Sequence, residues 1–322
     1  MLLINHYIKA LHKIFKAYNI LLVTHNRPDG DALASIGVMS ELLVGMDKKF
    51  TAYCEDPAPQ HYNFLPHVEK IVTDKAKLNF AQFDLIIALD CGSLSRTTLV
   101  NEISERGKNQ FVIEFDHHPK VDDYSNLEIR YPQDSSTAEI LYYFLKANNI
   151  KFNKNFANCI LTGILTDTGN FLYPSTTEAT VKIASKMLSY GARFPIIMEH
   201  TCRNKSINGM KIWGKAMDNL KINKKYNFAF TVLKQRDIIK YKVSDEELEG
   251  VSGFLSNLSE VKALLFLREE KNGKLKGSLR TSHPDIDISK LAVKLGGGGH
   301  PKASGFMLDG QLEETKTGWR VI

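Results

Sequence analysis

Short apolar runs alternate with amphipathic segments along the first part of the chain. Helical spacing of apolar residues recurs in segments such as TAEILYYFLKANN and ATVKIASKMLSYGA. The alternation predicts an α/β domain with a doubly wound parallel sheet over residues 1–192. Three runs rich in β-branched or aromatic residues indicate its buried parallel strands: ILLVT at 20–24, LIIAL at 85–89 and FVIEF at 111–115.

The pattern changes near Tyr190. A polar, largely helical stretch at 193–225 is expected to connect two domains, because 322 residues exceed the usual size of a single core. Residues 226–322 combine several strands with a few helical runs, which predicts a smaller α+β domain across a cleft from the first. Its strands are expected in NFAFTVL, VKALLFLRE, KLKGSLRT and GFMLDG.

Charge changes along the chain in the same way. Residues 1–200 carry 20 Lys and Arg against 22 Asp and Glu, whereas residues 201–322 carry 22 against 14. A basic domain beside a metal site attracts phosphodiesters, so this distribution favours an acidic substrate.

The composition also bears on the compartment. The cysteines are widely spaced and form no C-x-x-C pair, which indicates reduced thiols and a cytoplasmic protein. Lys9 and Lys13 interrupt the apolar residues near the start, which predicts an amphipathic first helix rather than a signal peptide. No apolar run approaches the roughly 18 residues of a membrane span. The oligomeric state stays open, with a homodimer among the possibilities. The four cysteines are Cys54, Cys91, Cys159 and Cys202.

Four acidic or histidine-bearing segments lie in the first domain, and three of them directly follow the predicted strands. Carboxyl ends of parallel strands border one crevice, so we expect the segments to converge. A site made of two of their imidazoles and four of their carboxylates suits Mn²⁺ or Mg²⁺ better than a structural zinc. Two such cations about 3.5–4 Å apart can share a carboxylate, acidify a bridging water and stabilise displacement at phosphorus. The segments are THNRPDGD at 24–31, DCGS at 90–93, DHHP at 116–119 and TDTG at 166–169.

Asp90 stands alone at the end of its strand and is the candidate bridge between two metals. The other candidates divide into His25 and Asp29 for one cation and Asp31, His117 and Asp167 for the second.

Several of these residues also have a purely structural interpretation. Asp31 could cap the helix that follows it, and Asp167 could simply end a helix. Asp116 is better interpreted as orienting an imidazole than as a ligand. Taken together the carboxylates still favour a metal, because they would repel one another without a cation.

The glycine run Gly296–Gly299 can be interpreted in two ways. Successive glycines can form a nest of backbone N–H groups around an anion, or only a flexible turn between a helix and the last strand. Arg280, on the predicted strand GSLRT, favours anion binding because a guanidinium matches phosphate in a bidentate way.

These motifs, followed by GGGGHPKASG at 296–305, resemble the DHH/DHHA1 phosphoesterase family. Over nearly all of the chain, the resemblance is greatest to its branch of bifunctional oligoribonucleases and pAp phosphatases. Asn26-Arg27 and Lys120 differ from the commonest family forms, but neither replaces a ligand. The resemblance implies two divalent cations, Mn²⁺ first and Mg²⁺ as the alternative, bound by His25, Asp29, Asp31, Asp90, His117 and Asp167. It further implies catalytic roles for His118, which faces the substrate phosphate, and for Asp90 and Asp116, with nucleotide contacts from Arg280, Gly297, Gly298, Gly299 and His300.

The expected function is degradation of very short single-stranded oligoribonucleotides to mononucleotides, with removal of the 3′-phosphate of pAp. The resemblance also implies a preference for di- to pentanucleotides. A phosphodiesterase for c-di-AMP or pApA would use the same metal ligands, so the sequence does not separate it. A family II inorganic pyrophosphatase lacks the GGGH segment, which opposes that alternative. A nucleotide-binding sensor would have lost the metal ligands, yet all six are present.

Overall fold

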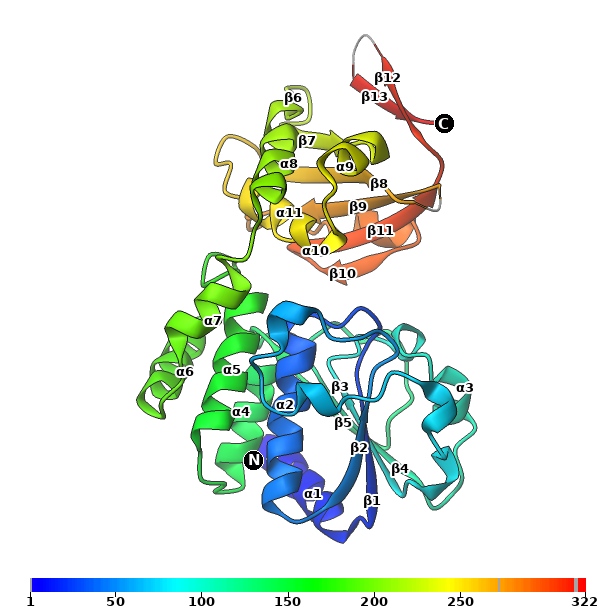
Figure 1. The fold of residues 1–322 in the computed structure, drawn as a ribbon, viewed down its shortest axis with the longest axis vertical. Helices are drawn as coiled ribbons and strands as arrows, with labels where there is room; N and C mark the ends of the chain where they lie inside the picture. The colour runs from blue at the N-terminus through cyan, green and yellow to red at the C-terminus, as the bar shows by residue number, and fades with distance from the viewer. Residues whose placement is uncertain (1, 272, 316–317) are drawn as a thin grey trace. The chain divides into compact units, whose positions relative to one another are not determined.

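One large sheet organises each of the two units, and the last two strands of the chain pair with each other in a separate two-stranded sheet (Figure 1). The structure is a computed structural model and describes residues 2–271, 273–315 and 318–322. The N-terminal unit is Met1–Asn204 and the C-terminal unit is Lys205–Ile322. The stretch expected as a connector is shared between them, because α7 (Phe194–Thr201) lies in the first and α8 (Ile207–Asp218) in the second. Among the described helices, none combines the length and apolarity that a bilayer crossing requires.

The sheet of the N-terminal unit is parallel throughout, with the strand order β2-β1-β3-β4-β5. Alternate residues of a strand join different cores: Ile20 and Leu22 belong to one apolar cluster, and Leu21 and Val23 to another. Both faces of the sheet are therefore buried, as apolar parallel strands require. The strands are β1 (Asn19–Val23), β2 (Lys49–Tyr53), β3 (Leu85–Leu89), β4 (Phe111–Asp116) and β5 (Leu127–Arg130).

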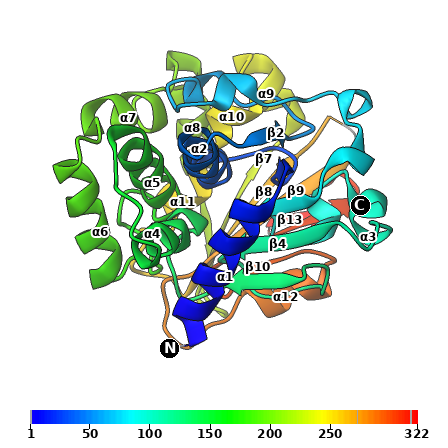
Figure 2. The same ribbon diagram turned by 90° about the horizontal axis from the view of Figure 1, so that it is seen from below.

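Helices α2, α4 and α5 gather on one side of this sheet with α6 outside α5, and α3 lies on the other side (Figure 2). Close packing of α2 on α5 depends on glycine, since a Cβ on Gly37 would lie 2.7 Å from Cys159 Sγ. The helices are α1 (Leu2–Lys16), α2 (Gly30–Gly45), α3 (Val100–Ser104), α4 (Thr137–Ala147), α5 (Lys154–Asp167), α6 (Glu178–Ser189) and α7. Short 3₁₀ helices occupy Gln60–Tyr62, Val68–Lys70, Lys75–Lys77, Phe80–Gln82 and Leu94–Arg96.

The strand order locates the ligand crevice. In an order of 2-1-3-4-5 the chain changes direction across the sheet between β1 and β3, and ligands bind outside the carboxyl ends of the strands at that point. The segment that begins at Thr24 follows β1, and Asp90 follows β3. The doubly wound fold that the apolar pattern predicts is confirmed, and it directs two of the four motif segments to the switch point.

The C-terminal unit is smaller and mixed, as predicted. Its six-stranded sheet has the order β10-β11-β9-β8-β7-β6, with β7 and β8 parallel and the other ladders antiparallel. Apolar residues of α8, α9 and α11 form one core with β7 and β8, and α12 packs into another with β9 and β11. The strands are β6 (Lys221–Asn223), β7 (Phe228–Leu233), β8 (Ala263–Glu269), β9 (Lys274–Arg280), β10 (Gly298–His300), β11 (Ala303–Asp309), β12 (Leu312–Thr315) and β13 (Gly318–Val321). The helices are α8, α9 (Gln235–Tyr241), α10 (Asp245–Leu248), α11 (Val251–Leu255) and α12 (Ser289–Lys294).

Candidate metal centre

His25 lies two residues beyond the end of β1, and its side chain is almost completely buried. Its Nδ1 is 2.7 Å from the Asn26 carbonyl oxygen, which can only accept, so Nδ1 carries the proton and donates. The buried Nε2 forms no hydrogen bond among the described residues. It is 3.7 Å from Asp29 Oδ2 and 3.9 Å from Asp90 Oδ2. An imidazole whose Nε2 faces two carboxylates, with its other nitrogen fixed by a carbonyl, fits a divalent cation.

Asp90 lies between imidazoles on two sides. Its Oδ2 approaches His25, while its Oδ1 is 3.6 Å from His117 Nε2 and 3.5 Å from His118 Nδ1. The residue is buried and has a φ of 58°, a left-handed conformation that Asp tolerates better than most residues. The Thr137 hydroxyl donates to Asp90 Oδ1 over 2.8 Å and fixes the carboxylate. One carboxylate is thereby presented to two groups of potential ligands.

Five of the six proposed ligands, all but Asp167, form two overlapping groups, and Asp90 also forms a further group with Asp116 and His118. His25, Asp29 and Asp90 form one, and Asp31, Asp90 and His117 form the other, with the ligand atoms of each group within 4.8 Å of one another. Asp90 is the member that the two groups share. Such an arrangement can hold two cations with one bridging carboxylate.

Asp31 is held by the start of a helix distant in sequence. The backbone N–H groups of Thr137 and Ala138 donate to its Oδ2 and Oδ1 over 2.6 and 3.0 Å. The interpretation of Asp31 as a cap of the helix that follows it was wrong. Asp29 takes that position and accepts from the N–H groups of Asp31 and Ala32, both over 3.1 Å. Asp31 is instead fully buried against the first turn of α4, in a place where a Cβ on Gly163 would lie 2.4 Å from its Oδ1.

Asp167 is the last residue of α5, and its Oδ2 is 3.0 Å from His117 Nε2. The sequence interpretation of Asp167 as a helix end and its interpretation as a metal ligand are therefore compatible. Burial would lower the pKa of His117, but the charge of Asp167, with Asp90 and Asp31, raises it well above the usual value. The surrounding carboxylates thus favour positive charge at the position of this ring.

Asp116 is a buried anchor for His118. It accepts from the Gly92 N–H over 2.6 Å and from the backbone N–H of His118 over 2.8 Å, and its Oδ1 is 2.9 Å from His118 Nδ1. Gly92 has a φ of 70°, which a side chain would strain. Burial opposes ionisation of Asp116, but His118 and the Arg130 guanidinium hold its pKa below the usual range. Burial also lowers the pKa of His118, despite the hydrogen bond to Asp116.

Without a cation the cluster carries too much negative charge. Burial raises the pKa of Asp90 well above its usual value, and the neighbouring carboxylates of Asp31 and Asp29 raise it further. Burial and the charge of Asp167 do the same for Asp31. A divalent cation would remove this penalty, so the donor set and its electrostatics both fit metal binding.

Two residues that support the cluster were missed from the sequence. Thr137 contacts Asp31 and Asp90, and Arg130 lies 3.4 Å from Asp116 Oδ1 and forms a buried ion pair with Glu114. The only signal was the polar segment DSSTAE at 134–139, because the stretch before it, NLEIRYPQ, is not an apolar run like those before the other motifs. The run at 127–130 was not recognised as the strand β5.

The proposed substrate residues lie in the C-terminal unit. Arg280 ends β9, and its Nη1 donates to the Leu279 carbonyl over 2.8 Å. The expectation of a glycine loop was wrong in its secondary structure, because Gly298–His300 is the edge strand β10 and pairs with β11. A Cβ on Gly297 would lie 2.0 Å from the Gly305 carbonyl oxygen. Close backbone packing therefore accounts for glycine here.

Comparisons with known proteins bear on both units. Residues 19–164 match the DHH family, N-terminal domain, and residues 223–317 match the DHHA1 domain. A relative from Streptococcus mutans, named probable bifunctional oligoribonuclease and PAP phosphatase NrnA, is 29% identical over 92% of either chain. Proteins of the same name, without the qualifier, are 28% identical in Thermus thermophilus over 90% of this chain and 84% of that one, and 27% in Bacillus subtilis over 89% and 88%. A crystal structure of an exopolyphosphatase-related protein from Bacteroides fragilis superposes with a TM-score of 0.84 at 27% identity, over 94% of this chain and 90% of that one.

Proposed function

Because the chain belongs to the DHH/DHHA1 phosphoesterase family, we propose that it is a divalent-metal-dependent phosphohydrolase acting on very short oligoribonucleotides. It releases mononucleotides and also removes the 3′-phosphate of pAp. Both activities are those named for its relatives from Thermus thermophilus and Bacillus subtilis.

The observation that carries the proposal is the position of Asp90. This buried carboxylate belongs to both groups of potential ligands, and one of its oxygens lies 3.9 Å from the orphaned Nε2 of His25. If Asp90 had only a structural role, the arrangement would not explain why the buried Nε2 of His25 has no hydrogen-bond partner in the described part of the chain. A two-cation site uses both the carboxylate and the imidazole lone pair.

We propose Mn²⁺ as the cation, with Mg²⁺ as the alternative, because the donors are carboxylate oxygens and two imidazoles without thiolate. When bound, such cations supply Lewis acidity and neutralise charge on a phosphoryl group. His25, Asp29 and Asp90 would hold one cation. The second would be held by Asp31, Asp90, His117 and Asp167.

His118 would contact the substrate phosphate. Its Nδ1 is turned toward Asp116, which fixes the ring and leaves Nε2 as the atom to face substrate. Burial lowers the pKa of the ring. A phosphate dianion beside it would favour protonation, and Nε2–H would then donate to a phosphate oxygen. Asp116 acts through His118 and is a positioning residue.

Arg280, Gly297, Gly298, Gly299 and His300 are proposed to bind the nucleotide. They lie in the half of the chain in which residues 201–322 carry 22 basic against 14 acidic side chains. An extended glycine edge such as β10 allows a ligand to approach the backbone closely, since a Cβ on Gly298 would meet nothing within 4 Å.

We further propose a cytoplasmic location, because all four cysteines are free in the structure. Three of them are buried, and burial raises the pKa of the Cys54 thiol to about 12. Buried protonated thiols are inert and suit a reducing compartment.

Substrate profiling tests the function. With Mn²⁺, the protein should cleave 2- to 5-mers faster than a 24-mer at equal strand concentration, and it should release phosphate from pAp. Contacts with a small binding domain saturate after a few nucleotides, so extra length adds ordering cost without binding energy. pApA, cyclic di-AMP and pyrophosphate complete the panel and discriminate the alternative activities.

One substitution tests whether oligoribonucleotide cleavage and pAp hydrolysis use the same metal centre. His25→Ala should abolish cleavage of the 3-mer and hydrolysis of pAp together, while His12→Ala, at an exposed position on α1, should change neither. A 24-mer degraded as efficiently as a 3-mer would contradict the short-substrate proposal. Survival of pAp hydrolysis in His25→Ala would contradict a shared metal centre.

A further inference from the structure

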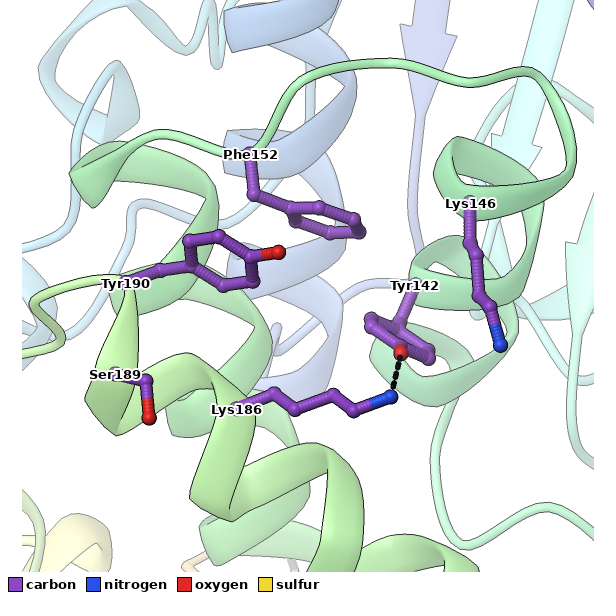
Figure 3. Close-up of a pocket in the computed structure, with 6 residues that line it drawn as sticks. All are labelled: Tyr142, Lys146, Phe152, Lys186, Ser189 and Tyr190. Atoms are coloured by element: carbon purple, nitrogen blue, oxygen red, sulfur yellow. Dashed lines mark hydrogen bonds between the residues drawn. The ribbon is translucent and has the colours of Figure 1, made fainter.

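A hollow lies in the N-terminal unit, at the opposite ends of the helices that carry the metal centre. Its lining residues are Tyr142, Lys146, Phe152, Lys186, Ser189 and Tyr190, around a volume of about 370 Å³ (Figure 3). The metal centre uses the first turn of α4 and the last residue of α5. The hollow uses the end of α4, the segment before α5 and the end of α6. From Thr137 to Lys146 the helix axis rises about 14 Å, so the two sites are separate.

Flat aromatic rings form one wall of the hollow. The rings of Phe152 and Tyr190 stack with centroids 5.2 Å apart and planes 22° apart, and Tyr142 lies 5.3 Å from Phe152 at 31°. Tyr190 remains 47% exposed, whereas Tyr142 is buried in the core. An exposed ring on a buried support is a platform on which a planar ligand can stack.

Two ammonium groups line the same hollow. The Lys186 side chain reaches across to Tyr142, and its Nζ donates to the phenol oxygen over 3.3 Å (Figure 3). Within residues 2–271, 273–315 and 318–322, neither Lys146 nor Lys186 forms an ion pair with a carboxylate. Both are exposed lysines with their charge available to a ligand.

The surrounding chain reinforces this positive charge. No Asp or Glu occurs from Ile140 to Thr166 or from Ala179 to Met198, although the two stretches contain six Lys and Arg residues. The nearby carboxylates are already engaged: Glu178 pairs with Lys182, and Glu41 accepts from Asn153 and Asn155 over 2.8 and 3.0 Å. Residues 1–200 carry slightly more acidic than basic side chains, so these two stretches are unusually basic for this part of the chain. The six basic residues are Lys146, Lys151, Lys154, Lys182, Lys186 and Arg193.

We propose that this hollow is a second nucleotide-binding site. The base stacks on the Phe152–Tyr190 wall, and the phosphate lies between the ammonium groups of Lys146 and Lys186. An apolar ligand would leave both lysines without an anionic partner, and an inorganic anion would leave the rings without a stacking partner. A nucleotide satisfies both, and pockets of this volume hold small ligands. The nucleotide is either free or a unit of single-stranded RNA, which present the same chemistry.

Photo-crosslinking of the metal-free full-length protein with 8-azido-AMP tests the site without turnover. We expect labelling of the tryptic segment 187–193, which contains Ser189 and Tyr190, and a half-saturating concentration that rises with ionic strength. Tyr190→Ala should weaken this labelling about tenfold. Lys186→Gln should weaken it to the same extent, read in the longer tryptic segment 183–193 because this variant loses the cleavage site at 186. Lys182→Gln is the matched control, because Lys182 lies one turn away on α6 and pairs with Glu178 instead of lining the hollow.

Competition identifies the ligand. AMP should displace the probe from this segment at lower concentration than adenosine or inorganic phosphate, because only AMP has both the ring and the charge. If a 24-mer of A competes better than AMP at equal strand concentration, the ligand is a unit of RNA. If AMP competes at least as well as the 24-mer, the ligand is the free nucleotide. Absence of label in 187–193, equal effects of Lys186→Gln and Lys182→Gln, or adenosine competing as well as AMP would overturn the proposal. The proposed catalytic function would stand in each case, because it depends on other residues.

Discussion

The metal cluster of the N-terminal unit and the glycine segment of the C-terminal unit fix their polar groups in opposite ways. In the cluster, side chains carry the chemistry, and Asp31 is held by backbone N–H groups of α4 over 2.6 and 3.0 Å. In the glycine segment the backbone itself is packed, since a Cβ on Gly297 or Gly299 would lie 2.0 or 2.7 Å from a carbonyl oxygen of β11. The fold of the first region should therefore tolerate substitutions that keep the shape of a side chain and remove its charge, whereas the second should not tolerate a Cβ at Gly297 or Gly299.

Charge repulsion and burial of carboxylates destabilise the metal-free cluster, whereas the glycine segment contains no charged group. Burial and neighbouring carboxylates raise the pKa of Asp90 and of Asp31, so their ionised forms destabilise the metal-free fold. Neutral substitutions at Asp90 or Asp31 should thus lower activity and raise the stability of the metal-free fold. Substitutions at Gly297 or Gly299 should lower stability first.

The largest effect is expected for Asp90→Asn. The substitution keeps the shape and an αL-tolerant residue, but it removes the charge that both ligand groups share. Turnover should fall by at least about a thousandfold, because the site loses a ligand of both cations. Bound metal, measured on the purified protein, should fall with it.

The stability of the same variant should change in the other direction when metal is chelated. A carboxylate whose pKa is raised on folding contributes fully below its unfolded pKa, and that stability is lost as pH rises toward the folded value. Metal-free Asp90→Asn should therefore melt higher than metal-free wild type at pH 8, and the difference should shrink as pH falls toward 4. A variant that keeps two cations, or that melts lower at pH 8, would show that Asp90 is neither a bridge nor an electrostatic liability.

A pair of adjacent glycines tests the other region. Gly297→Ala places a Cβ against the Gly305 carbonyl oxygen and should destabilise the C-terminal unit by about 3 kcal/mol. Gly298→Ala meets nothing within 4 Å and should melt like wild type. Both tryptophans, Trp213 and Trp319, lie in this unit, so fluorescence follows its unfolding selectively. Equal melting of the two variants would contradict the packing explanation.

Local patterns predicted the buried strands and the convergence of the motif segments. The runs before Thr24, Asp90 and Asp116 are strands at the predicted places, because parallel strands buried on both faces are apolar throughout. β5, LEIR, has only two buried residues, alternating with half-buried ones, so its signal was too weak. Because β5 was not recognised, the roles of Thr137 and Arg130 in supporting the cluster were not predicted either.

Other features depended on contacts that sequence spacing does not contain. Asp31 is held by α4, more than a hundred residues away, so no local rule could distinguish that contact from a cap of its own helix. Gly298–His300 becomes a strand because β11 lies beside it with Gly305 opposite Gly298. A glycine run by itself indicates conformational freedom and carries no information about its neighbour.

A smaller effect on activity is expected from substitution of Thr137, which is not a proposed ligand but contacts both Asp31 and Asp90. Its hydroxyl donates to Asp90 over 2.8 Å, while its backbone N–H holds Asp31, and the latter contact survives any substitution except proline. Thr137→Val removes only the hydroxyl at a fully buried position, so the fold should remain while metal affinity and kcat fall about tenfold. Thr137→Ser should restore both. Thr162→Val is the matched control, because this buried hydroxyl bonds the Asn158 carbonyl oxygen and contacts no proposed ligand. If the Val variants at 137 and 162 bound metal equally well, the Asp90 carboxylate would be positioned by its backbone alone, and the contrast between side-chain and backbone control of the two regions would not hold.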